Sequence, residues 1–159
     1  MTPSDARLDK ERAKELLVHI EKLVASNPKE SVLGDVVKAL NEVPSYSWVG
    51  VYRLVGNELV LCAWAGPQAT VHTRIPVGKG VCGWAARSGR TEIVSDVSKD
   101  SRYLECFTNT KSEIVVPILS EGKVVGELDI DGTALNAYSL IDKQLLEAVA
   151  ERISTYCKG

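Results

Sequence analysis

Residues 113–131 read Glu-Ile-Val-Val-Pro-Ile-Leu-Ser-Glu-Gly-Lys-Val-Val-Gly-Glu-Leu-Asp-Ile-Asp, two β-rich runs on either side of a short polar segment. Valine and isoleucine in the runs 113–119 and 124–131 favour extended backbone. Glu121, Gly122 and Lys123 between the runs are typical of a hairpin turn. The stretch therefore predicts two neighbouring antiparallel strands.

Acidic residues recur at every second position of the later strand. Because side chains alternate along a strand, Glu127, Asp129 and Asp131 share one face, while Leu128 and Ile130 point the other way. Two interpretations stay open. The carboxylates could form the solvated face of an antiparallel sheet, which is common. They could also line the floor of a pocket, where they would bind an ammonium group or hold a proton for general acid catalysis.

Glu113 opens the earlier strand. If the turn sets the pairing, Glu113 lies near the far end of the later strand, close to Asp129 and Asp131. It would then join the same acidic cluster. The alternative is a solvated acid at the entrance of a strand.

The rest of the chain is expected to supply helices and further strands. Apolar residues at helical spacing predict a helix over 6–25 and a second helix that Ser31 caps and Pro44 closes. The remaining expected elements are strands 47–54 and 58–65 joined by a turn at Gly56-Asn57, a strand at 71–76, a short helix that follows the glycine-rich turn 78–83 and runs to Ala86, a strand at 92–94, and a terminal helix capped by Ser139.

This order predicts an α+β fold with a mainly antiparallel sheet of about six strands, covered on one face by the terminal helices and carrying the site on the other. With 159 residues, the chain is expected to be one domain, 1–159.

Its 19 basic and 21 acidic residues are interspersed, which disfavours binding to nucleic acid or to anionic membranes. The longest apolar runs, such as 114–119, are far shorter than the roughly 20 residues that span a bilayer. Since the N-terminus lacks the features of a secretory signal, we expect a cytoplasmic protein.

The chain has four cysteines, which in a reducing compartment are packing residues, ligands or reactive thiols more often than disulfides. Cys106 lies in the longest irregular segment, 95–111, where a thiol can either meet a ligand or tuck the loop down. Arg102 or Lys111 nearby would favour its thiolate and adjacent Glu105 would disfavour it, so the reactivity stays open at this point.

The other three cysteines differ in their surroundings. Cys82 lies in a Gly-Val-Cys-Gly turn at a helix start, where backbone N–H groups can stabilise a thiolate, although a tight turn also simply requires small residues. Cys62 and Cys157 are expected to be packing or surface residues.

No metal or cofactor is expected. The chain has no C-x-x-C pair, and His72, Cys82 and Cys106 lack the short spacings of recognisable zinc sites. The turn at Gly78-Lys79-Gly80 lacks the rest of a phosphate-binding or dinucleotide-binding motif.

Four segments recur together in one known group of proteins. They are Ser47-Trp48-Val49-Gly50-Val51-Tyr52, Arg74-Ile75-Pro76-Val77-Gly78-Lys79-Gly80-Val81-Cys82-Gly83, Cys106 followed by Ser112-Glu113-Ile114-Val115-Val116-Pro117, and Leu128-Asp129-Ile130-Asp131. In this order they resemble the GAF-domain free methionine-(R)-sulfoxide reductases.

The resemblance implies a GAF fold that encloses free methionine sulfoxide and reduces its R epimer to methionine. Cys106 matches the nucleophile of that family. Trp48 and Tyr52 match residues that wall the pocket around the methyl sulfoxide end, although aromatic residues on a strand are also common in a core. Glu113, Asp129 and Asp131 match the substrate-binding carboxylates, with Glu113 and Asp131 as candidate proton donors.

The implied chemistry is thiolate attack on the sulfoxide sulfur while an acid protonates the oxygen, which yields methionine and a cysteine sulfenic acid. A second thiol then condenses with the sulfenic acid, and a thioredoxin-like protein or a small thiol completes the reduction. GAF domains often dimerise, so a homodimer is an arrangement open to this chain.

The chain departs from the family at two positions. The usual resolving cysteine is replaced by His72, so either Cys82 resolves the sulfenic acid, if its Cα comes within about 7 Å of that of Cys106, or an external thiol does. Phe107 also follows Cys106 where the family typically has aspartate.

Two other functions remain open. One is a non-catalytic GAF sensor that binds an amino acid or another small effector. The other is a redox-responsive interaction module that works through Cys82 and Cys106. A cyclic-nucleotide GAF domain is disfavoured because its asparagine-lysine-phenylalanine-aspartate-glutamate signature is missing.

Overall fold

The computed structural model describes residues 7–158, which form one six-stranded sheet and four α-helices. The strands are β1 (Trp48–Val55), β2 (Glu58–Ala65), β3 (Arg74–Pro76), β4 (Glu92–Val94), β5 (Ser112–Ser120) and β6 (Lys123–Gly132). The helices are α1 (Lys10–Ser26), α2 (Val32–Asn41), α3 (Gly80–Ser88) and α4 (Leu140–Cys157), with single 3₁₀ turns at Lys29–Ser31 and Val97–Lys99. All strand pairs are antiparallel, in the order β3-β2-β1-β6-β5-β4, which confirms the expected α+β architecture.

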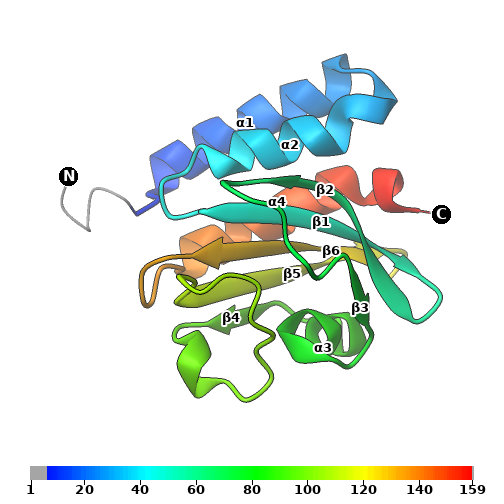
Figure 1. The fold of residues 1–159 in the computed structure, drawn as a ribbon. Helices are drawn as coiled ribbons and strands as arrows, with labels where there is room; N and C mark the ends of the chain where they lie inside the picture. The colour runs from blue at the N-terminus through cyan, green and yellow to red at the C-terminus, as the bar shows by residue number, and fades with distance from the viewer. Residues whose placement is uncertain (1–6, 159) are drawn as a thin grey trace.

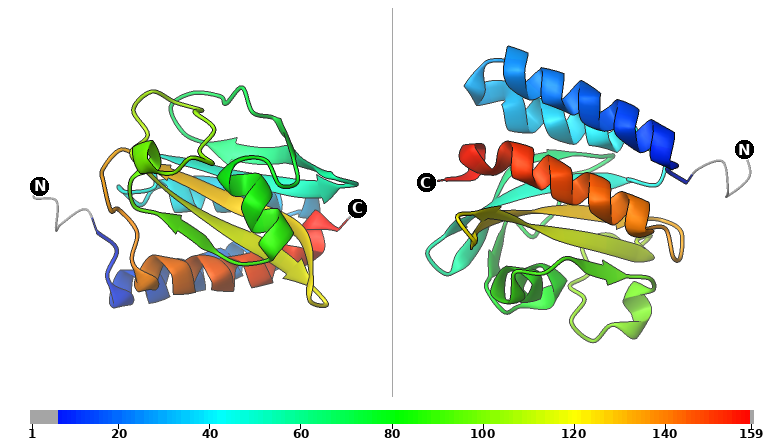
Figure 2. Two further views of the ribbon diagram at one scale, coloured as in Figure 1. Left: turned by 90° about the horizontal axis from the view of Figure 1, so that it is seen from below. Right: turned by 180° about the vertical axis from the view of Figure 1, so that it is seen from behind.

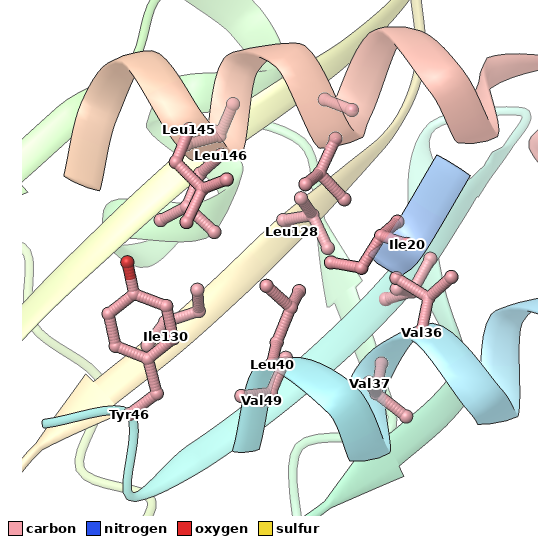
Figure 3. Close-up of a cluster of buried hydrophobic side chains, with 14 of the residues drawn as sticks. Ile20, Val36, Val37, Leu40, Tyr46, Val49, Leu128, Ile130, Leu145 and Leu146 are labelled. Atoms are coloured by element: carbon pink, nitrogen blue, oxygen red, sulfur yellow. The ribbon is translucent and has the colours of Figure 1, made fainter. Parts of the chain in front are cut away.

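The two faces of the sheet have different covers. Helices α1, α2 and α4 lie on one side, and α3 with the segment 95–111 lies on the other (Figure 1, Figure 2). Alternation along β1 divides its side chains accordingly, with Val49 and Val51 in the core under the helices and Trp48 and Tyr52 in the core beside α3. Figure 3 shows the core under the helices, where aliphatic side chains of α1, α2 and α4 meet those of β1 and β6.

The central hairpin forms as its sequence predicts. Ser112 pairs with Gly132 and Ser120 with Lys123, so only Glu121 and Gly122 form the turn and Lys123 begins β6. Their φ angles of 52° and 77° are the left-handed values that a two-residue hairpin turn requires. This short turn fixes the register and places Glu113 opposite Asp131.

Ser139 caps α4 as expected, in a capping box with Asp142. Ser31 does not cap α2, because its hydroxyl donates instead to the carbonyl of Pro28. The first helix begins at Lys10, with Asp9 as its N-cap, while Ala6, where the helix was expected to start, lies outside the described residues.

Three other boundaries differ from the sequence expectation. Helix α2 ends at Asn41 rather than at Pro44, β3 begins at Arg74 rather than at 71, and α3 continues past Ala86 to Ser88. Within residues 7–158, no helix is long and apolar enough to cross a membrane.

The buried Tyr46–Asp142 hydrogen bond provides a test of this packing. The Tyr46 hydroxyl donates to Asp142 Oδ1 at 2.7 Å. Tyr46→Phe should lower the free energy of unfolding by about 1–3 kcal/mol, because it leaves a buried carboxylate oxygen without its donor. Denaturant unfolding measures the loss.

Tyr156→Phe is the matched control, since Tyr156 is only partly buried and its hydroxyl has no hydrogen bond within residues 7–158. Its effect should stay within about 0.5 kcal/mol. Equal losses in the two variants would contradict the importance assigned to the Tyr46 bond.

Candidate active site

The acidic face of β6 is buried. Only 0–2% of Glu127, Asp129 and Asp131 is exposed, and Glu113 is 4% exposed. The solvated-face interpretation is therefore wrong for all four residues, because α3 and the segment 95–111 cover this side of the sheet. The predicted pairing of Glu113 beside Asp129 and Asp131 is confirmed by the strand register.

These carboxylates have little basic compensation, which comes from His72, whose charge lowers the pKa of Asp129. Among residues 7–158, none of the four forms a salt bridge. Both oxygens of Glu127, both of Asp131 and Oδ1 of Asp129 are also without a hydrogen-bond partner. Buried unpaired carboxylates are unfavourable, so the cluster favours bound protons or a cationic ligand.

Glu113 and Asp129 divide the roles of acid and base. Burial, and then the charge of Asp129, raises the pKa of Glu113 well above its usual range. The hydrogen bond between the two raises the pKa of Glu113 and lowers that of Asp129, although burial still leaves the pKa of Asp129 above normal. Glu113 therefore holds a proton more readily than Asp129 does.

Cys82 lies in the first turn of α3, with its Sγ 4.0 Å from Glu113 Oε2. Of the two interpretations of this helix start, the stabilised thiolate is disfavoured. Burial, followed by the charges of Asp129 and Glu127, raises the pKa of Cys82 well above its usual value. Cys82 is therefore held as a neutral thiol.

Helix α3 and strands β5 and β6 bring together a possible set of metal ligands that sequence spacing did not reveal. Cys82 Sγ and one oxygen each from Glu113 and Asp129 lie within 4.8 Å of one another. The residues come from α3, β5 and β6, so no short sequence motif marks them.

Cys106 is partly buried in the loop before β5, with Sγ 3.6 Å from the carbonyl of Leu104. Burial, followed by the charges of Asp129 and Asp131, raises the pKa of Cys106 to about 12. A hydrogen bond with Thr70 acts in the opposite direction.

Arg102, which the sequence suggested as a thiolate-stabilising neighbour of Cys106, is paired with other groups. It forms salt bridges with Asp100 at 2.7 Å and Glu92 at 3.4 Å. Burial and the two acids outweigh the effect of Thr70, so Cys106 is a thiol in the free protein.

Two small cavities are lined in part by the Cys106–Phe107 segment. The first, about 10 Å³, is lined by Cys106 and Cys82 together with His72, Ile75, Val81, Leu104, Glu113 and Asp129. The second, about 40 Å³, includes Trp48, Phe107 and Asp131 in its lining. A cavity needs roughly 10–15 Å³ on this measure to hold one water, so an amino acid can enter only if the loop moves outward.

Larger hollows of about 570 and 720 Å³ lie elsewhere on the surface. They contain none of the four acids and neither Cys106 nor Cys82.

Trp48 and Phe107 form an aromatic wall beside the acids. Their ring centroids are 5.7 Å apart, and Trp48 also stacks on Trp64 at 6.4 Å. The Trp48 ring lies over Gly50, where a Cβ would come within 2.4 Å of it, so this arrangement requires glycine. Phe107 was noted in the sequence only as a departure from the family, and its contact with Trp48 gives it a place in the site.

Tyr52 is fully buried and lines neither cavity. Its hydroxyl donates to the carbonyl of His72 at 2.8 Å. The predicted contact of Tyr52 with substrate stays a prediction, while its observed contact is with the segment that follows β2.

Residues 28–156 match the GAF domain family. The chain belongs to the GAF domain family. It is 40% identical to GAF domain-containing protein A of Dictyostelium discoideum over 141 residues, which cover 87% of this chain and 88% of that protein. It is 41% identical to the free methionine-R-sulfoxide reductase of Saccharomyces cerevisiae over 115 residues, 70% of this chain and 63% of the yeast protein.

A solved structure is similar over nearly the whole GAF domain. The structure of free methionine-R-sulfoxide reductase from Neisseria meningitidis, in complex with its substrate, superposes with a TM-score of 0.86 at 34% identity and covers 93% of this chain and 89% of that one. The resemblance drawn from the sequence segments is thereby confirmed.

The reactivity of Cys106 tests the electrostatics of the site. Because the pKa is about 12, the rate of Cys106 alkylation by iodoacetamide should rise with pH from 7 to 10 without levelling. Asp129→Asn removes a negative charge that disfavours the thiolate, so it should lower the pKa and speed alkylation at pH 8, about tenfold for each pKa unit. Peptide mass spectrometry resolves the site of modification.

Exposed Cys62 is the internal control, and Glu121→Gln in the exposed β5–β6 turn is the control variant. Asp129→Asn should leave the alkylation rate of Cys62 unchanged, and Glu121→Gln should leave that of Cys106 unchanged. A rate for Cys106 that levels off below pH 9 would contradict the raised pKa.

Proposed function

We propose that the chain reduces free methionine-(R)-sulfoxide to methionine through a sulfenic acid on Cys106. The observation that carries the proposal is the cluster of buried, largely uncompensated carboxylates that faces this thiol. A free amino acid brings the ammonium group that such a cluster lacks, and a sulfoxide brings an oxygen that accepts a proton. Relatives that match most of the chain and are named free methionine-R-sulfoxide reductases support this enzyme class.

The reaction begins when Cys106 sulfur attacks the sulfoxide sulfur. Glu113, as the protonated acid, donates a proton to the sulfoxide oxygen as the S–S bond forms. The hydroxyl then passes to the Cys106 sulfur while the substrate S–O bond and the S–S bond break, which leaves methionine and a Cys106 S–OH. Overall, one thiol and one sulfoxide become one sulfenic acid and one thioether, so the thiol proton restores Glu113. No cofactor takes part.

Asp129 and Asp131 hold the substrate ammonium in this proposal, and Asp131 is a second candidate proton donor because burial also raises its pKa well above normal. The bound cation offsets the two charges that raise the pKa of Cys106. Substrate binding thus promotes formation of the thiolate, whereas the free protein keeps the nucleophile protonated. The Trp48–Phe107 wall excludes water and contacts the sulfur and methyl group, and Tyr52 is expected to add to this wall.

A GAF sensor that binds an amino acid without reacting is the second candidate. The raised pKa of Cys106 favours it, because a thiol of this kind is a poor nucleophile until something neutralises Asp129. The two functions share the ammonium site and differ in turnover.

Incubation with racemic free methionine sulfoxide and dithiothreitol separates them when each epimer is followed by chiral chromatography. The R epimer should disappear, Cys106→Ser should abolish the loss, and Glu113→Gln should lower kcat by about 10²–10⁴. Cys62→Ser is the matched control and should retain activity, since Cys62 is exposed on β2. Binding without loss of either epimer would establish the sensor instead.

Regeneration of the Cys106 thiol requires a second thiol, which either Cys82 or an external reductant can supply. Cys82 lines the same cavity as Cys106, which favours it as the resolving residue. Its raised pKa makes it slow at neutral pH, since the thiolate is the attacking form. We therefore expect a thioredoxin-like protein or a small cytoplasmic thiol to react first at pH 7.

One turnover without reductant tests this order. At pH 7, dimedone should trap Cys106 as a sulfenic acid. At pH 9, the larger thiolate fraction of Cys82 should convert it to a Cys82–Cys106 disulfide that mass spectrometry detects. Cys82→Ser should give only the sulfenic acid at both pH values. Complete disulfide formation at pH 7 would contradict the slow role given to Cys82.

The same proposal treats the chain as one GAF domain, 1–159, acting in the cytoplasm. The nucleophile, acid and ammonium site all come from residues 48–131, so a homodimer would not be needed to complete the site.

A further inference from the structure

The loop that carries Cys106 is held by a side chain from across the cavity. His72 Nε2 lies 3.0 Å from the carbonyl oxygen of Glu105, the residue directly before Cys106. A carbonyl oxygen only accepts, so the ring nitrogen must carry a hydrogen and donate. The neutral Nε2–H tautomer and the imidazolium both do so, and the bond therefore does not require a charged ring.

His72 is itself held in place. Its backbone N–H donates to Thr70 Oγ1 at 3.0 Å, and its carbonyl accepts from the hydroxyl of buried Tyr52 at 2.8 Å. Thr70 also lowers the pKa of the Cys106 thiol. The segment between β2 and β3 thus holds the backbone of the nucleophile loop through His72 and affects its thiol through Thr70.

The loop has few other ties near Cys106. Among the described residues, His72 is the one side chain outside the loop that hydrogen-bonds the backbone of residues 104–108. Phe107 packs on Trp48, and this contact involves the ring of Phe107 rather than the Glu105 peptide. His72 also lines the first cavity together with Cys106.

We propose that His72 is a positioning residue, which holds the Cys106 loop closed over the acidic site by donating to the Glu105 carbonyl. An amino acid can enter only when the loop moves outward, because the two cavities are too small for it. The His72 bond returns the loop to the geometry in which Cys106 faces Asp129 and Glu113. Attack on a sulfoxide depends on that geometry, since small misplacements of a reacting atom lower the rate strongly.

Two variants separate the donor from the ring. His72→Phe keeps a planar ring and removes the donor, whereas His72→Gln places an amide N–H at similar reach. His72→Phe should lower kcat about fivefold to tenfold, with KM changed less than about threefold, because closure rather than the ammonium site is affected. His72→Gln should stay within about twofold of the unmodified protein.

The rate at which iodoacetamide alkylates Cys106 without substrate gives a second readout. It should rise in the variant whose kcat falls. Release of the loop exposes the thiol and relieves its burial, so His72→Phe should raise the alkylation rate about threefold to tenfold. His72→Gln should not. Buried Cys157 in α4 reports on general loosening and should remain unmodified in both variants.

The kinetic arm rests on the proposed reductase function, and the alkylation arm does not. If the unmodified protein consumes no sulfoxide, the proposed function fails while alkylation still decides the role of His72. Unchanged alkylation of Cys106 in His72→Phe would overturn the positioning role. Equal defects in His72→Phe and His72→Gln, or a parallel rise at Cys157, would also overturn it.

Discussion

The chemistry of this protein depends on one physical constraint, the removal of four carboxylates from water with no salt bridge to any of them within residues 7–158. Glu113, Glu127, Asp129 and Asp131 occupy paired strands and are at most 4% exposed. Such a group is unfavourable unless it binds protons or a cation. The stability to hold it comes from the opposite face of the sheet, where α1, α2 and α4 bury an aliphatic layer.

The same constraint governs both thiols of the site. Cys106 and Cys82 face the acids, and each has its pKa raised by burial and by Asp129. A nucleophile that stays protonated until a cation arrives is protected from oxidation when no substrate is bound. Loop closure then matters as much as charge, because Cys106 belongs to a loop whose position His72 helps to hold.

Much of the fold was predictable because its signals are local. The turn at Glu121 and Gly122 sets the register of β5 and β6, and Glu113 meets Asp131 as the sequence predicts. The Ser139 cap of α4 was likewise predictable because it depends on residues that are close in the chain. The chemical state of the site was less predictable. A helix start favours a thiolate by local rules, yet burial and then the acids brought in from β5 and β6 raise the pKa of Cys82 instead.

The sequence by itself determined the strands, the hairpin register and the set of residues that carry chemistry, since alternation, turn residues and caps act between neighbours in the chain. Only the tertiary structure decided that the acidic face is buried. An alternating acidic strand reads the same whether water or protein covers it, and the cover comes from α3 and the 95–111 loop. The contact between His72 and Glu105 joins segments 33 residues apart, and no local pattern encodes it.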